Sequence, residues 1–143
     1  MTIAEKKNAL LTRLSAIKNS QERFAHLIAL SRQQPPLESQ FKTDTYRVEG
    51  CLAKLWFVAE FRDGRCYFRA DSESAIVKSV AVLLCDFYNA QAPEEIVSTD
   101  PSFFESVGIS QHLTQNRRNS LSKIWEKIRS FAEAHIAPEQ MAA

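Results

Sequence analysis

The fold of this chain is decided by residues 55–72, which read LWFVAEFRDGRCYFRADS. Two runs rich in apolar and aromatic residues flank Asp63-Gly64, and this dipeptide is a strong signal for a two-residue hairpin turn. A turn there puts six apolar side chains on one face, in three cross-strand pairs: Phe61 with Cys66, Ala59 with Phe68, and Phe57 with Ala70. The opposite face is mostly polar or charged. Because a slip of one residue would turn every side chain to the other face, this separation predicts both the hairpin and its register.

The predicted sheet extends beyond the hairpin, because a lone two-stranded hairpin is only marginally stable in water. Residues 46–49 carry a short β-type pattern and predict a further strand. We therefore expect a small antiparallel sheet of about three strands.

Two helices are predicted before the sheet. Thr2 and Glu5 form a T-x-x-E capping box, which predicts a helix from there to about residue 18. Asn19 is a favoured N-cap for a second helix. Pro35 and Pro36 cannot continue that helix, so residues 33–45 are expected to form a surface loop.

Four helical segments are predicted after the sheet. Gly108 is expected to end the third of them. Their start signals, in chain order, are Asp71 or Ser72, Pro93, Asp100-Pro101, and Thr114. Strands followed by helices indicate an α+β fold, with the helices packed on one face of the small sheet.

Size and composition indicate one ordinary domain. The chain has 143 residues, of which 45% are hydrophobic and 24% charged. We expect a single domain over residues 1–143 with a frayed tail at 137–143. The formal net charge of +1 argues against a nucleic-acid binder, which is usually strongly basic. The first 17 residues lack the apolar core of a signal peptide, and the longest apolar run, 80–85, is too short to cross a membrane, so we expect a cytoplasmic protein.

The three cysteines differ in their sequence environment. Cys66 falls on the apolar face of the hairpin, and Cys85 ends the apolar run 80–85 in the first helix predicted after the sheet, so both are expected to be buried. Cys51 follows Gly50 at a junction outside either periodic pattern, where glycine permits a tight turn. Arg47 and Lys54 lie nearby, and positive charge favours the thiolate form of a cysteine. An odd count without a C-x-x-C pair argues against a disulfide framework and against a zinc site.

The residues around Cys51 resemble a family signature. The stretch 48–51 followed by Trp56 is similar to V-x-G-C-x-x-x-x-W of the SufE family, the sulfur acceptors of iron–sulfur cluster assembly. Residues 71–78, residues 108–114 and then Arg117 resemble further family segments in the same order. The similarity runs from about residue 8 to residue 132, and this chain departs from the pattern at Arg47, Ala53, Ser79 and Ser120.

The resemblance implies an α+β fold of the SufE and IscU type, and roles for four residues. Cys51 would be the acceptor cysteine, taking persulfide sulfur from a pyridoxal-phosphate cysteine desulfurase of the SufS or CsdA type. It would pass the sulfur to a cluster scaffold such as SufBCD or to another acceptor. Asp71, Arg117 and His112 match family positions that support the loop or face a partner, His112 with the least certain role. The protein would be an accessory to the desulfurase, without a cofactor or metal of its own, and a monomer or homodimer.

Two other classes of function remain open from the residues alone. His112 and Cys51 could act as base and nucleophile of a thiol enzyme, if the fold brings them together. A metal or cluster scaffold would need about three convergent cysteines, and Cys66 and Cys85 are expected to be buried. The sequence contains no G-x-G-x-x-G, Walker or H-E-x-x-H motif for a cofactor or metal.

Overall fold

The hairpin has the predicted register. The computed structural model describes residues 2–102 and 113–136. Strands β1 (Leu55–Arg62) and β2 (Arg65–Ser72) pair antiparallel. The three predicted pairs are all present: Phe61 with Cys66, Ala59 with Phe68, and Phe57 with Ala70. Asp63 and Gly64 have φ angles of 52° and 76°, as expected for a two-residue turn in which both residues are left-handed.

The predicted third strand is reduced to a single bridge, which corrects the expected strand count. Arg47 forms an isolated antiparallel bridge with Trp56, and the Val48 amide donates to the Leu55 carbonyl at 2.8 Å. Turns precede this segment at residues 44–46 and follow it at residues 49–50, so too few residues are extended to form a strand. The sheet therefore has two strands in the described part of the chain.

Two helices precede the sheet, as predicted. Helix α1 (Ile3–Ser15) begins with the complete Thr2–Glu5 capping box and ends three residues before the predicted end. Helix α2 (Ser20–Ser31) is capped by the Asn19 side chain, which accepts hydrogen bonds from two backbone amides. A short 3-10 helix, η1 (Ser39–Phe41), lies in the loop that leads to the hairpin.

Three helices follow the sheet in the described residues: α3 (Ala75–Tyr88), α4 (Pro93–Val97) and α5 (Gln115–Ala134). Pro93 and Thr114 start α4 and α5 as predicted. The predicted cap of α3 was wrong, because Ser74, and not Asp71 or Ser72, accepts from the Val77 amide at 3.3 Å. Asp71 and Ser72 instead belong to β2. The helix predicted to end at Gly108 and the tail at 137–143 lie outside the described residues.

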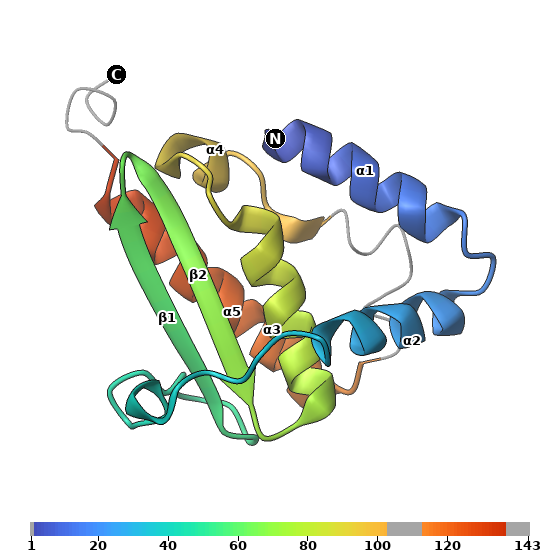
Figure 1. Cartoon of the computed structure of the whole chain (residues 1–143), viewed down its shortest axis with the longest axis horizontal. Coiled ribbons are helices and arrows are strands. Elements are labelled where there is room, and N and C mark those ends of the chain that lie inside the picture. The colour runs from blue at the N-terminus through green and yellow to red at the C-terminus, as the bar shows by residue number, and fades with distance from the viewer. Residues whose placement is uncertain (1, 103–112, 137–143) are drawn as a thin grey trace.

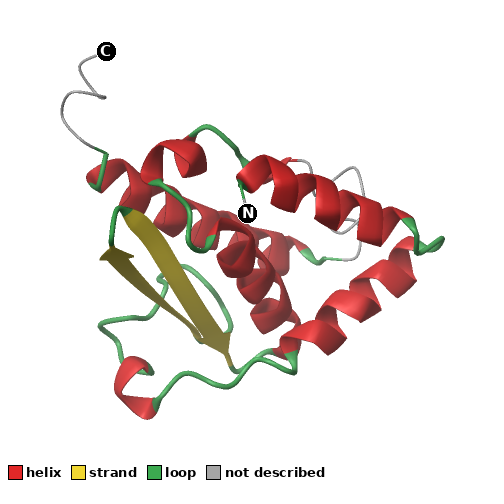
Figure 2. Cartoon of the chain, turned by 45° about the horizontal axis from the view of Figure 1, so that its top comes forward, coloured by secondary structure: helices red, strands yellow, loops and turns green. Residues whose placement is uncertain are grey.

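The main core lies between one face of the hairpin and α3 with α5, while α1 and α2 pack beyond α3 (Figure 1). Cys66, Phe68 and Ala70 of β2 are buried against these helices. Figure 2 shows the helices on one side of the hairpin and, on the other side, the loop that contains η1, here called the η1 loop (residues 33–46). That outer side holds a second cluster, in which Trp56, Val58 and Leu37 are buried.

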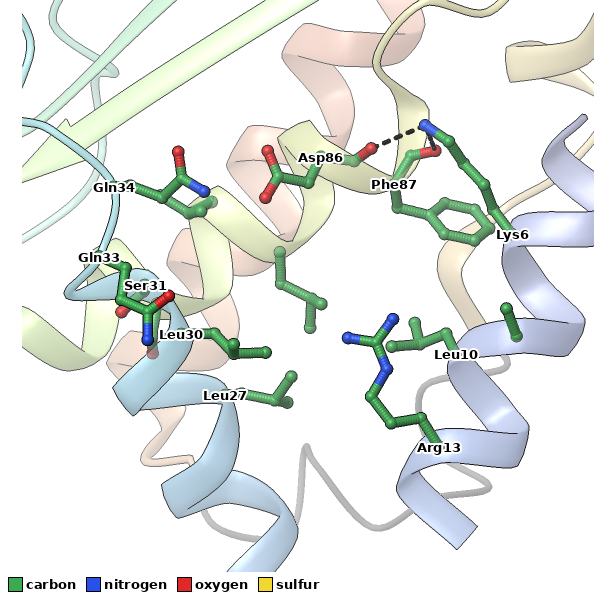
Figure 3. A pocket seen from close by; sticks show the side chains of 14 residues that line it. Lys6, Leu10, Arg13, Leu27, Leu30, Ser31, Gln33, Gln34, Asp86 and Phe87 are labelled. Carbon is green, nitrogen blue, oxygen red and sulfur yellow. Dashed lines mark hydrogen bonds between the residues drawn. The ribbon is translucent and has the colours of Figure 1, made fainter. Parts of the chain in front are cut away.

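Helix α1 is joined to the end of α3 by Lys6, whose ammonium donates to three carbonyl oxygens there. The distances are 2.9 Å to Asp86, 3.3 Å to Phe87 and 2.9 Å to Asn89. These carbonyls lie at the C-terminus of α3, where a positive charge is favourable. A cavity of about 400 Å³ lies beside this contact between α1, α2 and α3, with Leu10, Leu27 and Leu30 on its apolar wall (Figure 3). No helix in the described ranges has the length and apolar character needed to cross a bilayer.

Candidate functional site

Cys51 lies on the connection between the Arg47 bridge and β1, here called the Cys51 loop (residues 49–54). Gly50 has a φ of +86°, a conformation that glycine adopts without a steric penalty, so the predicted tight turn is present. The Cys51 side chain is half-buried and packs against the main core. The next side chain, Leu52, is 80% exposed. The loop therefore places the thiol at the boundary between core and solvent.

Both ends of the Cys51 loop are held by hydrogen bonds. At the start, the side-chain amide of Asn119 on α5 donates to the Gly50 carbonyl at 2.8 Å. At the end, the Lys54 carbonyl accepts from the Ser72 hydroxyl at 2.6 Å and from the Glu73 amide at 3.2 Å. Among the described residues, no hydrogen bond or ion pair fixes residues 51–53 themselves. The thiol is thus carried by a three-residue span fixed at its two ends.

The other two cysteines are buried, as predicted. Cys66 and Cys85 are 0% and 2% exposed. Burial raises the pKa of the Cys66 thiol to about 11, and the nearby Glu94 carboxylate acts in the same direction. Burial also raises the pKa of Cys85, with a contribution from Asp86. Both groups are therefore protonated thiols at neutral pH and face no solvent, which leaves Cys51 as the accessible cysteine of the chain.

Asp71 is a buried carboxylate on the outer side of the hairpin, opposite Trp56 in the sheet register. It accepts hydrogen bonds from the backbone amides of Leu37 at 3.0 Å and Ser72 at 2.8 Å. The ammonium groups of Lys42 and Lys78 lie 3.2 and 3.4 Å from its oxygens. Burial alone would raise the pKa of Asp71, but these four donors outweigh it and hold the pKa below the ordinary value. Asp71 therefore joins the η1 loop, β2 and α3.

Arg117 lies in the first turn of α5 and lines a cavity of about 350 Å³ beside the Cys51 loop. Leu52 and Ala53, the two residues after Cys51, form part of the same wall. Ser74 and Val77 at the start of α3 line it as well. The structure thus brings Arg117 next to the Cys51 loop, and it places Asp71 behind the hairpin. His112 lies outside the described residues.

Asn119 and Ser72 support the Cys51 loop, and neither role is predicted by the sequence. Asn119 is 69 positions from its partner Gly50, and a polar residue in a helix carries no signal for such a distant contact. Ser72 was assigned to a helix cap, which is an ordinary function for serine next to a predicted helix start. Only the three-dimensional arrangement of β2 and α5 around the loop reveals both contacts.

Fold and site together define a small α+β protein that presents one partly exposed thiol on a loop between a hairpin and a helix. Residues 8–132 match the model of the family described as SufE: Fe-S metabolism associated domain. The chain belongs to the SufE family, and the family associates it with sulfur transfer in iron–sulfur metabolism.

One curated relative is described as SufE-like, and one solved structure shares the fold. An uncharacterised SufE-like protein of Synechocystis is 26% identical over 125 residues, which cover 87% of this chain and 79% of that relative. The solution structure of a hypothetical protein from Thermus thermophilus has a similar fold. The two superimpose with a TM-score of 0.74 at 20% identity, covering 94% of this chain and 98% of the other.

Proposed function

We propose that this protein accepts sulfur on Cys51 from a pyridoxal-phosphate cysteine desulfurase of the SufS or CsdA type and delivers it for iron–sulfur cluster assembly. The observation that carries the proposal is the contrast between the three thiols. Cys51 is partly exposed on a loop, whereas Cys66 and Cys85 are buried. A protein that receives an atom from another protein needs a thiol that the donor can reach.

The transfer step is a thiol–disulfide type of exchange. The Cys51 thiolate attacks the terminal sulfur of the desulfurase persulfide, a new S–S bond forms on Cys51, and the S–S bond on the desulfurase breaks. The desulfurase cysteine leaves as a thiolate, ready for the next turnover. Removal of its persulfide is how the carrier would stimulate the enzyme, so the protein acts as an accessory and requires no cofactor of its own.

The surroundings of Cys51 fit contact with a protein partner. Leu52 is exposed beside the thiol, and the adjacent cavity of about 350 Å³ carries Arg117 on its wall. An apolar side chain and an arginine are both common in the centres of protein interfaces. We infer that the desulfurase covers this surface, and that a scaffold such as SufBCD or another acceptor later receives the sulfur from the same thiol.

Intact-mass spectrometry tests the proposal. The protein is mixed with a cysteine desulfurase and L-cysteine, and the expected result is a mass gain of one sulfur atom that peptide mapping places on Cys51. Cys51→Ser should abolish both the mass gain and the stimulation of the desulfurase. Cys66→Ser and Cys85→Ser are the matched controls, because each removes a thiol that is buried, and both should still be loaded. Sulfur on Cys66 or Cys85, or full stimulation by Cys51→Ser, contradicts the proposal.

A further inference from the structure

Helix α5 makes a direct contact with the backbone next to Cys51. The Asn119 side-chain amide donates to the carbonyl oxygen of Gly50 at 2.8 Å, a distance typical of a well-formed hydrogen bond. This carbonyl belongs to the peptide unit that links Gly50 to Cys51. Because the peptide unit is planar, fixing its oxygen also fixes the direction in which the chain enters Cys51.

The donor is attached to a well-packed part of the fold. Helix α5 buries Ile124 and Ile128 completely in the main core, and Ser120, the residue after Asn119, is also buried. A side chain on such a helix has a defined position relative to β1 and α3. The Cys51 loop, in contrast, has no bonds of its own over residues 51–53 among the described residues. The Asn119 contact therefore joins a loosely held segment to a firmly held one.

A second residue of α5, Lys123, lies against the turn at Gly50. The Cε atom of Lys123, one helical turn after Asn119, lies 3.2 Å from the position that a Cβ atom on Gly50 would occupy. The Lys123 ammonium lies 3.7 Å from the Glu126 carboxylate on the same helix. The Gly50 turn is thus bounded by the Lys123 side chain and bonded to Asn119.

We infer that Asn119 is a positioning residue that keeps Cys51 half-buried in the free protein by holding the Gly50 carbonyl. This inference rests on the proposed function, because the role of Cys51 as sulfur acceptor is the reason for regulating access to that thiol. One neutral hydrogen bond at a partly exposed site shifts an equilibrium by about three- to tenfold. The contact is strong enough to favour the packed position of the thiol and weak enough for a binding partner to release it.

The test measures alkylation of each cysteine in the free protein by quantitative peptide mass spectrometry. Asn119→Ala removes the amide, and Asn119→Asp keeps its shape but replaces the donor with an acceptor that repels the Gly50 carbonyl. Both variants should alkylate at Cys51 about three- to tenfold faster than the wild type. Asn119→Gln retains an amide donor and should restore much of the native rate. Asn8→Ala is the matched control, since Asn8 is an exposed asparagine on α1 and does not belong to the elements that hold the Cys51 loop.

Cys66 and Cys85 serve as internal reporters in the same samples. A variant that merely loosens the fold would expose all three thiols together, whereas loss of a positioning contact should change Cys51 alone. Unchanged Cys51 rates in both Asn119→Ala and Asn119→Asp, or a parallel increase at all three cysteines, would overturn the inference. The measurement uses no desulfurase, so its outcome is separate from the sulfur-loading experiment. The proposed function would fail if the sulfur mapped to another cysteine, even with the Asn119 effect present.

Discussion

The hydroxyl of Ser72 donates a 2.6 Å hydrogen bond to the carbonyl oxygen of Lys54, joining the last residue of β2 to the last residue of the Cys51 loop. The Glu73 amide donates to the same carbonyl at 3.2 Å. Since Asn119 holds the other end at Gly50, the thiol-bearing span is fixed by residues from two elements that are distant in sequence. The position of Cys51 therefore depends on how the hairpin and α5 pack together.

Removal of the Ser72 hydroxyl should loosen the end of the loop. The same hydroxyl also accepts from the Ser74 amide at 3.1 Å. We expect Ser72→Ala to lower the free energy of unfolding by about 1–3 kcal/mol, the net contribution of two hydrogen bonds, and to increase Cys51 alkylation in the free protein. Chemical denaturation and alkylation mass spectrometry measure the two effects.

Ser98→Ala is the matched control, because the Ser98 hydroxyl donates to the Glu94 carbonyl at 2.8 Å at the end of α4. It should cost a similar or smaller amount of stability without changing Cys51 reactivity. Equal Cys51 rates in the Ser72 variant and the wild type would show that this bond does not limit access to the thiol.

Asp71 should make the stability of the fold sensitive to acid. Its pKa in the folded protein lies below the ordinary value of 3.8, so the folded state binds this proton more weakly than the unfolded state does. Its contribution is complete above that ordinary value and is lost as the pH falls below it. Denaturation curves measured between pH 7 and pH 3 should show this decrease in the free energy of unfolding.

Asp71→Asn should flatten the acid-dependent part of that curve. At pH 7 it should cost about 2–3 kcal/mol, less than a fully buried pair, because Lys42 and Lys78 keep partial access to solvent. Asp44→Asn changes an exposed carboxyl two residues after Lys42 and should stay within about 0.5 kcal/mol of the wild type. If Asp71→Asn loses as much stability in acid as the wild type does, then groups other than Asp71 cause the acid sensitivity.

The hairpin could be predicted because its signals are local. The Asp63-Gly64 turn and the alternation of apolar residues specify the register without reference to the rest of the chain. Thr2, Asn19 and Thr114 were predicted as caps for the same reason, since each bonds to amides two or three residues away.

The errors arise where distant segments compete for the same groups. Asp71 was a plausible helix cap from sequence, but its carboxylate is used by the Leu37 amide and two lysines, and Ser74 caps α3 instead. The third strand is missing because turns on both sides leave only a bridge at Arg47. Cys51 was singled out correctly as a loop cysteine because the other two fit periodic apolar patterns, whereas the Asn119 contact has no local signal.

Lys6 should contribute to the packing of α1 on α3. Its ammonium is bonded to three carbonyl oxygens at the end of α3, two of which are drawn in Figure 3. Lys6→Met keeps most of the aliphatic stem but removes these bonds, so we expect a loss of about 2 kcal/mol in the free energy of unfolding.

Lys18→Met provides the comparison, because Lys18 is exposed after the end of α1. It should change stability by less than about 0.5 kcal/mol. Neither variant should alter sulfur loading at Cys51, since both residues lie outside the elements that hold the loop. If the two variants are equally stable, the hydrogen bonds of Lys6 contribute no more to the free energy of unfolding than hydration of its ammonium does in the unfolded chain.

Gly50 and Gly64 offer a matched pair for testing the turn before Cys51. Both have left-handed backbone conformations, with φ angles of 86° and 76°. An alanine at either position should therefore cost about 1–2 kcal/mol of stability from backbone strain. The pair differs in its surroundings, because a Cβ atom on Gly50 would lie 3.2 Å from Cε of Lys123, whereas a Cβ atom on Gly64 meets no atom within 4 Å.

Gly50→Ala should consequently disturb the Cys51 loop, and Gly64→Ala should not. The new methyl group crowds Lys123 and strains the bond between the Gly50 carbonyl and Asn119, so Cys51 alkylation should rise by about threefold or more. Adding Lys123→Ala to Gly50→Ala removes the crowding and should recover part of the native rate, while the cost of the backbone conformation remains. If Gly50→Ala and Gly64→Ala lose equal stability and leave Cys51 equally reactive, then the turn conformation contributes to folding alone and does not position the thiol.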